Sequence, residues 1–121
     1  MIGNLFATVI DCPDPDELAG FYAELLGLSR QEDTGEYAVL QNDAGVAVLA
    51  FQRVEDFRAP RWPDPARPSQ MHLDVLVENL DVAEEQVLAQ GATLLDGSDK
   101  PIGYRVYADP VGHPFCLITP Q

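Results

Sequence analysis

Hydrophobic and polar residues follow one another in this chain in an order that predicts a strand, a helix and a hairpin. Apolar residues at alternate positions predict a strand over residues 6–12. A helix is expected next, because Asp14 suits an N-cap, Pro15 suits the first helical position and Gly27 suits a left-handed C-terminal residue. Strand-like runs between residues 37 and 52 then flank a turn-rich segment, which predicts a hairpin.

The same order of elements recurs after residue 70. A strand is expected over residues 71–77, and its alternation places His72 and Asp74 on one face. Asn79 suits the N-cap of a second helix, which is expected to end at Gly91. Further strand-like runs lie at 92–95, 104–108 and 115–119. A shift of the chain by 64 residues puts Gly27 on Gly91, so the sequence predicts two copies of one structural pattern.

The predicted organisation is a single domain, residues 1–121, made of two modules and a connection. The first module is expected over residues 1–52 and the second over residues 71–121. Prolines at four positions exclude a regular helix or central strand from the connection, residues 53–70. Four of the seven cationic residues of the chain lie in this connection around its one tryptophan, Trp62: Arg53, Arg58, Arg61 and Arg67.

Composition narrows the class of protein. A chain of 121 residues with 46% hydrophobic residues can form one compact core. Its net charge of −13 disfavours nucleic acid and anionic membranes as partners, and no apolar run is long enough to span a bilayer. We therefore expect a cytoplasmic protein, in which Cys12 and Cys116 are small buried residues and do not form a disulfide.

Several short motifs extend over the whole chain: Asp14, Phe21-Tyr22, Leu26-Gly27, Trp62-Pro63, His72-Leu73-Asp74, Asn79-Leu80-Asp81, Gly91-Ala92 and residues 109–117. Their order and spacing resemble the vicinal oxygen chelate superfamily, which includes glyoxalases, bleomycin-resistance proteins and extradiol dioxygenases. The nearest likeness is to its small glyoxalase-like subgroup. The resemblance implies an α+β fold in which two βαβββ modules form an eight-stranded, curved mixed sheet around a concave pocket, often in a homodimer.

The resemblance also implies where a metal would bind. Metal-dependent members hold a divalent ion at up to four positions, two in each module. In this chain those positions fall on Ala7 or Thr8, within Val48–Phe51, on His72 and on Cys116. Only the last two offer a usable ligand, so we expect no metal, no cofactor and no glyoxalase activity. The leading hypothesis is metal-independent binding or sequestration of a small molecule.

An enzyme is the main alternative. His72 and Asp74 lie two apart on one strand face, where a carboxylate can orient an imidazole for acid–base chemistry in a lyase, isomerase or hydrolase. A relocated metal held by His72, Asp74 and Cys116, with His113 as a further ligand, is a second form of this alternative. The simplest reading is a neutral His72 that is hydrogen-bonded to Asp74 without any chemistry.

The connection suggests the character of a ligand. Trp62 offers a flat apolar face and Arg61 a forked donor, so the expected ligand is a planar or aromatic molecule with one acidic group. The other residues expected around it are His72, Asp74, Asp11, Val9 and Cys116. The alternative is a surface loop whose arginines pair with Asp56 and Asp64, or a dimer contact through Trp62.

The strand at residues 104–108 leaves one question open. Its alternation is expected to set Arg105 on the face opposite to Tyr104 and Tyr107. One of these two sets must face the pocket, and a five-residue strand does not decide which.

Overall fold

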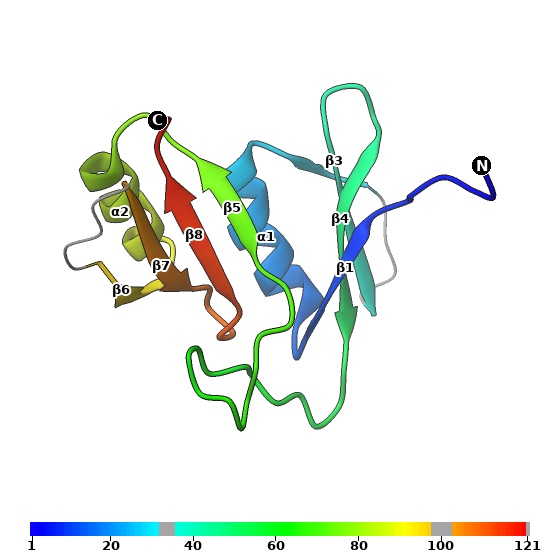
Figure 1. Ribbon diagram of the computed structural model, residues 1–121. Helices are drawn as coiled ribbons and strands as arrows, with labels where there is room; N and C mark the ends of the chain where they lie inside the picture. Colours follow the sequence, from blue (N-terminus) through cyan, green and yellow to red (C-terminus); the bar gives the residue numbers. More distant parts are fainter. Residues whose placement is uncertain (32–35, 98–102, 121) are drawn as a thin grey trace. The chain divides into compact units, whose positions relative to one another are not determined.

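The computed structural model describes residues 1–31, 36–97 and 103–120, which belong to two compact units, Met1–Phe57 and Arg58–Gln121. The first unit contains β1 (Thr8–Cys12), α1 (Pro15–Leu26), β2 (Ser29–Arg30), β3 (Tyr37–Gln41) and β4 (Ala47–Arg53). The second contains β5 (Leu73–Leu76), α2 (Leu80–Ala89), β6 (Thr93–Asp96), β7 (Tyr104–Ala108) and β8 (Pro114–Ile118). Both predicted copies of strand, helix and three strands are present (Figure 1).

Each unit has one mixed sheet, in which the first strand pairs in parallel with the last. The strand orders are β1-β4-β3-β2 and β5-β8-β7-β6, and the other neighbouring pairs are antiparallel. The α+β class is confirmed, with its eight strands divided between two sheets of four. The pattern of apolar and polar residues did not predict β2, which only the resemblance implied, because two exposed residues are too few to show alternation.

The predicted connection divides between the units. Residues 53–57 group with the first unit and residues 58–70 with the second. Within the described ranges, no helix is long and apolar enough to cross a membrane.

In the first unit, α1 covers one face of the sheet. Leu18 and Tyr22 are buried, and the Tyr22 ring stacks on Phe51 of β4 with 5.6 Å between ring centroids. The Asp14 side chain caps the helix by accepting from the backbone N–H groups of its first turn. Gly27 ends it with φ 66°, a left-handed conformation that glycine adopts without strain. The predicted start and end of this helix are confirmed.

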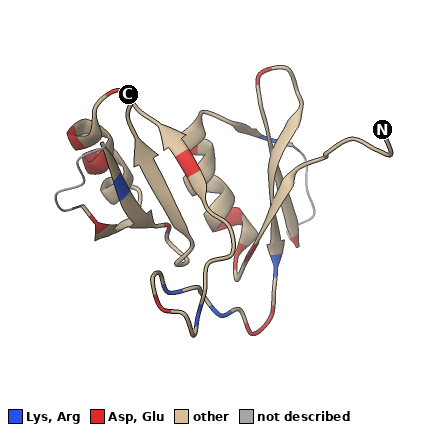
Figure 2. Ribbon diagram, in the orientation of Figure 1, with Lys and Arg blue, Asp and Glu red and all other residues tan. Residues whose placement is uncertain are grey.

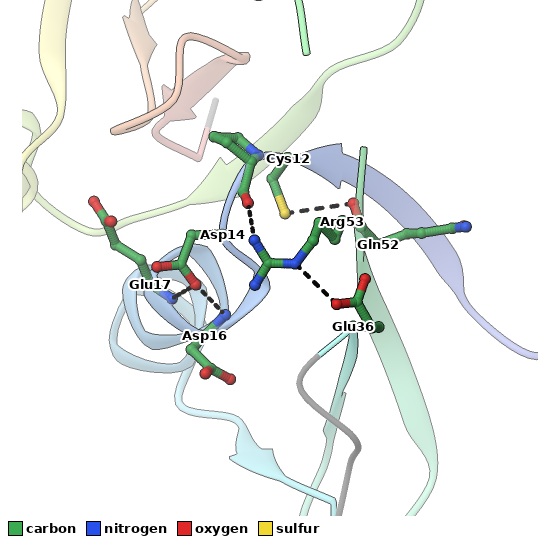
Figure 3. A network of polar contacts seen from close by, with 8 residues as sticks. Cys12, Asp14, Asp16, Glu17, Glu36, Gln52 and Arg53 are labelled. Atoms are coloured by element: carbon green, nitrogen blue, oxygen red, sulfur yellow. Dashed lines mark hydrogen bonds and ion pairs between the residues drawn. The ribbon is translucent and has the colours of Figure 1, made fainter. Parts of the chain in front are cut away.

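The Arg53 side chain ties the end of β4 to the turn before α1 (Figure 3). Its guanidinium donates to the Pro13 carbonyl at 2.7 Å, and its Nε lies 3.3 Å from a Glu36 carboxylate oxygen. Cys12 is buried beside it, and its thiol donates to the Gln52 carbonyl at 3.6 Å. Arg53 therefore has a structural role in the first unit. The expectation that it belongs with the other arginines of the connection is wrong, because nearer acceptors hold it.

In the second unit, α2 covers one sheet face, which presents Arg105 and Tyr107 of β7. The Tyr107 hydroxyl donates to Glu84 at 2.8 Å and the Arg105 guanidinium donates to Asp81 at 2.8 Å, so both side chains contact the helix. The expectation that Arg105 and Tyr107 face opposite ways is wrong, because residues two apart on a strand share a face. Tyr104 lies on the other face of β7.

Candidate functional site

Three side chains with chemical potential meet on the face of the second sheet that points away from α2. The parallel β5–β8 ladder pairs Asp74 with Cys116, which puts their side chains next to each other. His72 precedes β5 by one residue and shares the face of Asp74. One ligand atom from each of the three side chains lies within 4.8 Å of the other two. We call these three residues the β5–β8 cluster.

His72 and Asp74 are in direct contact. The His72 Nε2 lies 3.2 Å from an Asp74 carboxylate oxygen, and both side chains are about half exposed (52% and 54%). This position allows Asp74 to orient the imidazole ring. A pair this exposed adds little to folding stability.

Cys116 is the buried member of the cluster. Burial raises the pKa of its thiol to about 11, and the negative charge of Asp74, with a hydrogen bond to it, adds to this shift. The thiol is therefore protonated at neutral pH, and a protonated thiol is a poor nucleophile. Asp74 contacts both the imidazole and the thiol, whereas no hydrogen bond joins the His72 imidazole to the Cys116 thiol, the contact that activates a catalytic cysteine.

The first unit has no such chemistry at the equivalent positions. The N-caps Asp14 and Asn79 lie 65 residues apart, and this offset places Ala7 at the position of His72 and Val9 at that of Asp74. The ladder between β1 and β4 pairs Val9 with Ala50, which corresponds to Cys116. All three side chains are hydrocarbon. The family's metal positions in the first unit therefore supply no ligand for a divalent ion.

Val9 and Asp11 lie together on the first sheet, on the face away from α1. Val9 is 45% exposed, and Asp11 is exposed as well. Their ladder partners are Ala50 and Gln52. The structure thus brings His72, Asp74 and Cys116 together in one unit and Val9 with Asp11 in the other. A single pocket lined by all five stays a prediction.

Residues 61–67 form a closed loop that carries the tryptophan. The Arg61 N–H donates to the Arg67 carbonyl at 2.8 Å, and the Asp64 carboxylate accepts from the Ala66 N–H at 2.8 Å. Trp62 remains 37% exposed. The backbone of this loop is held in place, and it presents an indole surface to solvent.

The arginines in and just before this loop differ from the others in their ion pairing. The ion pairs described for arginine involve Arg30, Arg53 and Arg105. Between described residues, no ion pair involves Arg58, Arg61 or Arg67. Figure 2 shows several arginine positions, in blue, along the segment of chain that joins β4 to β5. The alternative paired these arginines with Asp56 and Asp64; among the described residues neither carboxylate forms an ion pair with them, and Asp64 accepts from the Ala66 N–H.

A shallow groove at the start of α2 was not anticipated from the sequence. It is lined by Val77, Glu78, Asn79, Val82, Ala83 and Gln86. Its one sequence signal is Val82, an apolar residue at an exposed position of α2 (55% exposed). The groove combines one carboxylate with apolar and amide groups, and we assign it no chemistry.

Comparison with known proteins defines the class. Residues 7–118 match the glyoxalase-like domain, so the chain belongs to this family, as the motifs of the sequence indicated. An enzyme of the glyoxalase/bleomycin resistance protein/dioxygenase family from Burkholderia phytofirmans PsJN is similar with a TM-score of 0.73 at 16% identity, covering 97% of this chain and 98% of that one. No curated protein matches this chain.

Two further solved structures are of proteins with a named function. The fosfomycin resistance protein FosX from Listeria monocytogenes is similar with a TM-score of 0.71 at 13% identity, covering 100% of this chain and 96% of that one. TnmS3, an antibiotic binding protein from Streptomyces sp. CB03234, is similar with a TM-score of 0.61 at 19% identity, covering 99% and 98%. At these identities the likeness establishes the fold and leaves the activity open.

Proposed function

We propose that this protein binds a small molecule without a resident metal ion, and that its ligand is a planar or aromatic acid. The observation that carries the proposal is the loop at residues 61–67, which combines an exposed indole with guanidinium groups that have no ion pair among the described residues. An aromatic ring stacks on an indole, and a carboxylate accepts two parallel hydrogen bonds from one arginine.

The absence of a resident metal rests on the donor set. The family positions in the first unit carry Ala7 and, within Val48–Phe51, Ala50. Neither side chain can coordinate an ion, so these family positions give a metal no ligand from the first unit. The antibiotic binding protein TnmS3 has the same fold, which is consistent with a role in binding.

Fluorescence provides a direct test, because Trp62 is the only tryptophan and its emission reports on this loop alone. Phenylacetate is the probe, with phenylacetamide and phenethylamine as its neutral and cationic counterparts. We expect phenylacetate to change the emission saturably and more tightly than either counterpart. Arg61→Gln should weaken binding of phenylacetate about tenfold, the usual effect of losing one charge-assisted hydrogen bond of ~1.4 kcal/mol.

Arg30→Gln is the matched control, because it removes an arginine that already pairs with Asp16 at 2.8 Å. Its affinity for phenylacetate should equal that of the unmodified protein. Trp62→Ala has no tryptophan emission, so its binding of phenylacetate is measured by calorimetry and should be weaker than that of the parent protein. The proposal is overturned if Trp62→Ala and Arg61→Ala both bind as the parent does, or if the cationic counterpart binds more tightly.

Metal independence has its own measurement. Protein purified without chelator should carry substoichiometric zinc, nickel, iron and manganese in elemental analysis. It should not convert the hemithioacetal of methylglyoxal and glutathione, because no Lewis acid is available to stabilise the enediolate. Turnover that chelator abolishes and nickel or zinc restores would contradict this part of the proposal.

We also propose a cytoplasmic homodimer. The cytoplasm suits two free cysteines, Cys12 and Cys116, both of which are buried. A second copy would cover sheet edges that one chain leaves unpaired, and it would need to bury more than roughly 1,000 Å² to be stable. Light scattering at tens of micromolar chain should give twice the mass of one chain.

A second function is favoured by one observation, the 3.2 Å contact between His72 and Asp74. An imidazole oriented by a carboxylate can move a proton in a lyase, isomerase or hydrolase without a metal. In that case turnover of a bound substrate would be insensitive to chelator and lost in His72→Gln. Binding of phenylacetate that survives this substitution with no turnover of any bound compound would favour the binding protein.

A further inference from the structure

We propose that His72, Asp74 and Cys116 form a binding site for a thiophilic divalent cation, with Zn²⁺ the best-suited ion, inside the second unit alone. The site lies at the β5–β8 cluster, and the ion would be taken up from solution. This inference goes beyond the proposed function, which needs no metal.

Distances between the donor atoms suit one ion. Zinc binds thiolate sulfur at about 2.3 Å, imidazole nitrogen at about 2.0–2.1 Å and carboxylate oxygen at about 2.0–2.2 Å, so donors at tetrahedral angles stand roughly 3.3–3.6 Å apart. The His72 and Asp74 atoms are already 3.2 Å apart, and all three donors lie within 4.8 Å. Closing the set requires movement of roughly an ångström, which the half-exposed His72 and Asp74 side chains can supply by rotation.

The backbone holds two of the donors in place. Asp74 and Cys116 are direct partners in the parallel β5–β8 ladder, so their separation is set by strand pairing. His72 approaches from the residue before β5 and already contacts Asp74. A site built on paired strands holds its ligands more accurately than one built on loops.

Donor chemistry selects the ion. A set of one thiolate, one imidazole and one carboxylate favours Zn²⁺ or Co²⁺ over Mg²⁺ and Ca²⁺, which require more oxygen ligands. When the metal–sulfur bond forms, the thiol proton of Cys116 passes to solvent. Three protein ligands leave the fourth tetrahedral position open to water or to an acidic group of a small molecule.

Cobalt and zinc titrations of the full chain, after dialysis against chelator and its removal, test the proposal. Added Co²⁺ should produce a thiolate-to-cobalt charge-transfer band that stops growing at one equivalent of Co²⁺. Added Zn²⁺ should then abolish the band. Cys116→Ser should lose the band, and His72→Gln and Asp74→Asn should each weaken Zn²⁺ binding at least tenfold by calorimetry. Because His72 and Asp74 are half exposed, their variants should melt cooperatively and stay informative if Cys116→Ser does not fold.

Matched controls come from the other cysteine and the other histidine. Cys12→Ser and His113→Gln should leave both the band and the affinity unchanged, since neither residue belongs to the cluster. A band that persists in Cys116→Ser, a band lost in Cys12→Ser, or no band with excess Co²⁺ would overturn the proposal. Failure here leaves the Trp62 titration with phenylacetate unaffected, so the zinc site and the proposed function are tested separately.

Discussion

Cys116 should be a slow nucleophile at neutral pH, and the structure gives the size of the effect. Its pKa is raised from an ordinary 9.0 to about 11, first by burial and then by Asp74. At pH 8 a thiol of pKa 9.0 is about one-tenth thiolate, whereas a thiol of pKa 11 is about one-thousandth thiolate. Because alkylation requires the thiolate, iodoacetamide should modify Cys116 about 100-fold more slowly than an ordinary thiol of equal accessibility.

Removing the charge of Asp74 should separate the two causes. Asp74→Asn eliminates the repulsion between carboxylate and thiolate but leaves Cys116 buried. Because burial is the larger cause, the pKa should fall and remain above 9.0. Alkylation at pH 8 should therefore become faster, by less than the 100-fold that a full return to the ordinary pKa would give.

The assay uses a Cys12→Ser background, in which Cys116 is the only thiol. Serine can keep the hydrogen bond that Cys12 donates to Gln52, so this background should fold. The rate should rise about tenfold per pH unit from pH 7 to pH 10 without a plateau, because the pKa lies above this range. Glu85→Gln removes a carboxylate from α2, on the opposite face of the same sheet, and should leave the profile unchanged. A plateau near pH 9, or an unchanged profile in Asp74→Asn, would refute the reasoning.

The same shift predicts how stability depends on pH. The folded protein binds the thiol proton more tightly than the unfolded chain, because its pKa is raised in the fold. The stability that this proton contributes is complete below about pH 9 and is lost as the pH rises toward 11. Urea unfolding measures this effect. Between pH 9 and pH 11, the free energy of unfolding should fall more steeply in the Cys12→Ser protein than in the variant that also carries Cys116→Ala.

Three further predictions concern the rest of the molecule. Tyr107→Phe should lower the free energy of unfolding by about 1–2 kcal/mol in urea melts, because it removes the hydrogen bond to Glu84; an unchanged midpoint would contradict this. Native mass spectrometry of fresh protein should show a dimer, and a monomer would remove the proposed assembly. Substituting Ala7→His, Val9→Asp and Ala50→Cys together should create a second cobalt-binding equivalent, and its absence would indicate that donor type alone does not make the site.

The local part of the fold was predictable from the sequence because its signals are local. Asp14 and Asn79 cap the two helices as expected, accepting hydrogen bonds from backbone N–H groups of the first turns. These signals need only a few neighbouring residues. Leu88 shows the limit: it is an apolar residue of α2 directly after the buried Val87, yet it is 42% exposed. Burial depends on how much of the sheet a helix covers, and spacing does not report that.

The candidate site was predictable in its residue types and only partly in its contacts. The two-residue spacing of His72 and Asp74 indicated a shared face, and the structure adds the 3.2 Å contact. That Asp74 pairs with Cys116 depends on the register of two strands 42 residues apart in the chain, which no local pattern reveals. The role of Arg53 was missed for the same reason, because its acceptor at Pro13 is 40 residues away.

The two units share one backbone plan but differ in chemistry, and this difference limits the function. At three equivalent positions, one unit has hydrocarbon side chains while the other has His72, Asp74 and Cys116. Since both units form the same ladders, the fold does not require these polar groups. The half-exposed pair of His72 and Asp74 contributes little to the stability of the fold. The raised pKa of Cys116 shows that the fold disfavours its thiolate form. Groups that the fold does not need, gathered within 4.8 Å on one unit alone, are therefore best explained by what they bind.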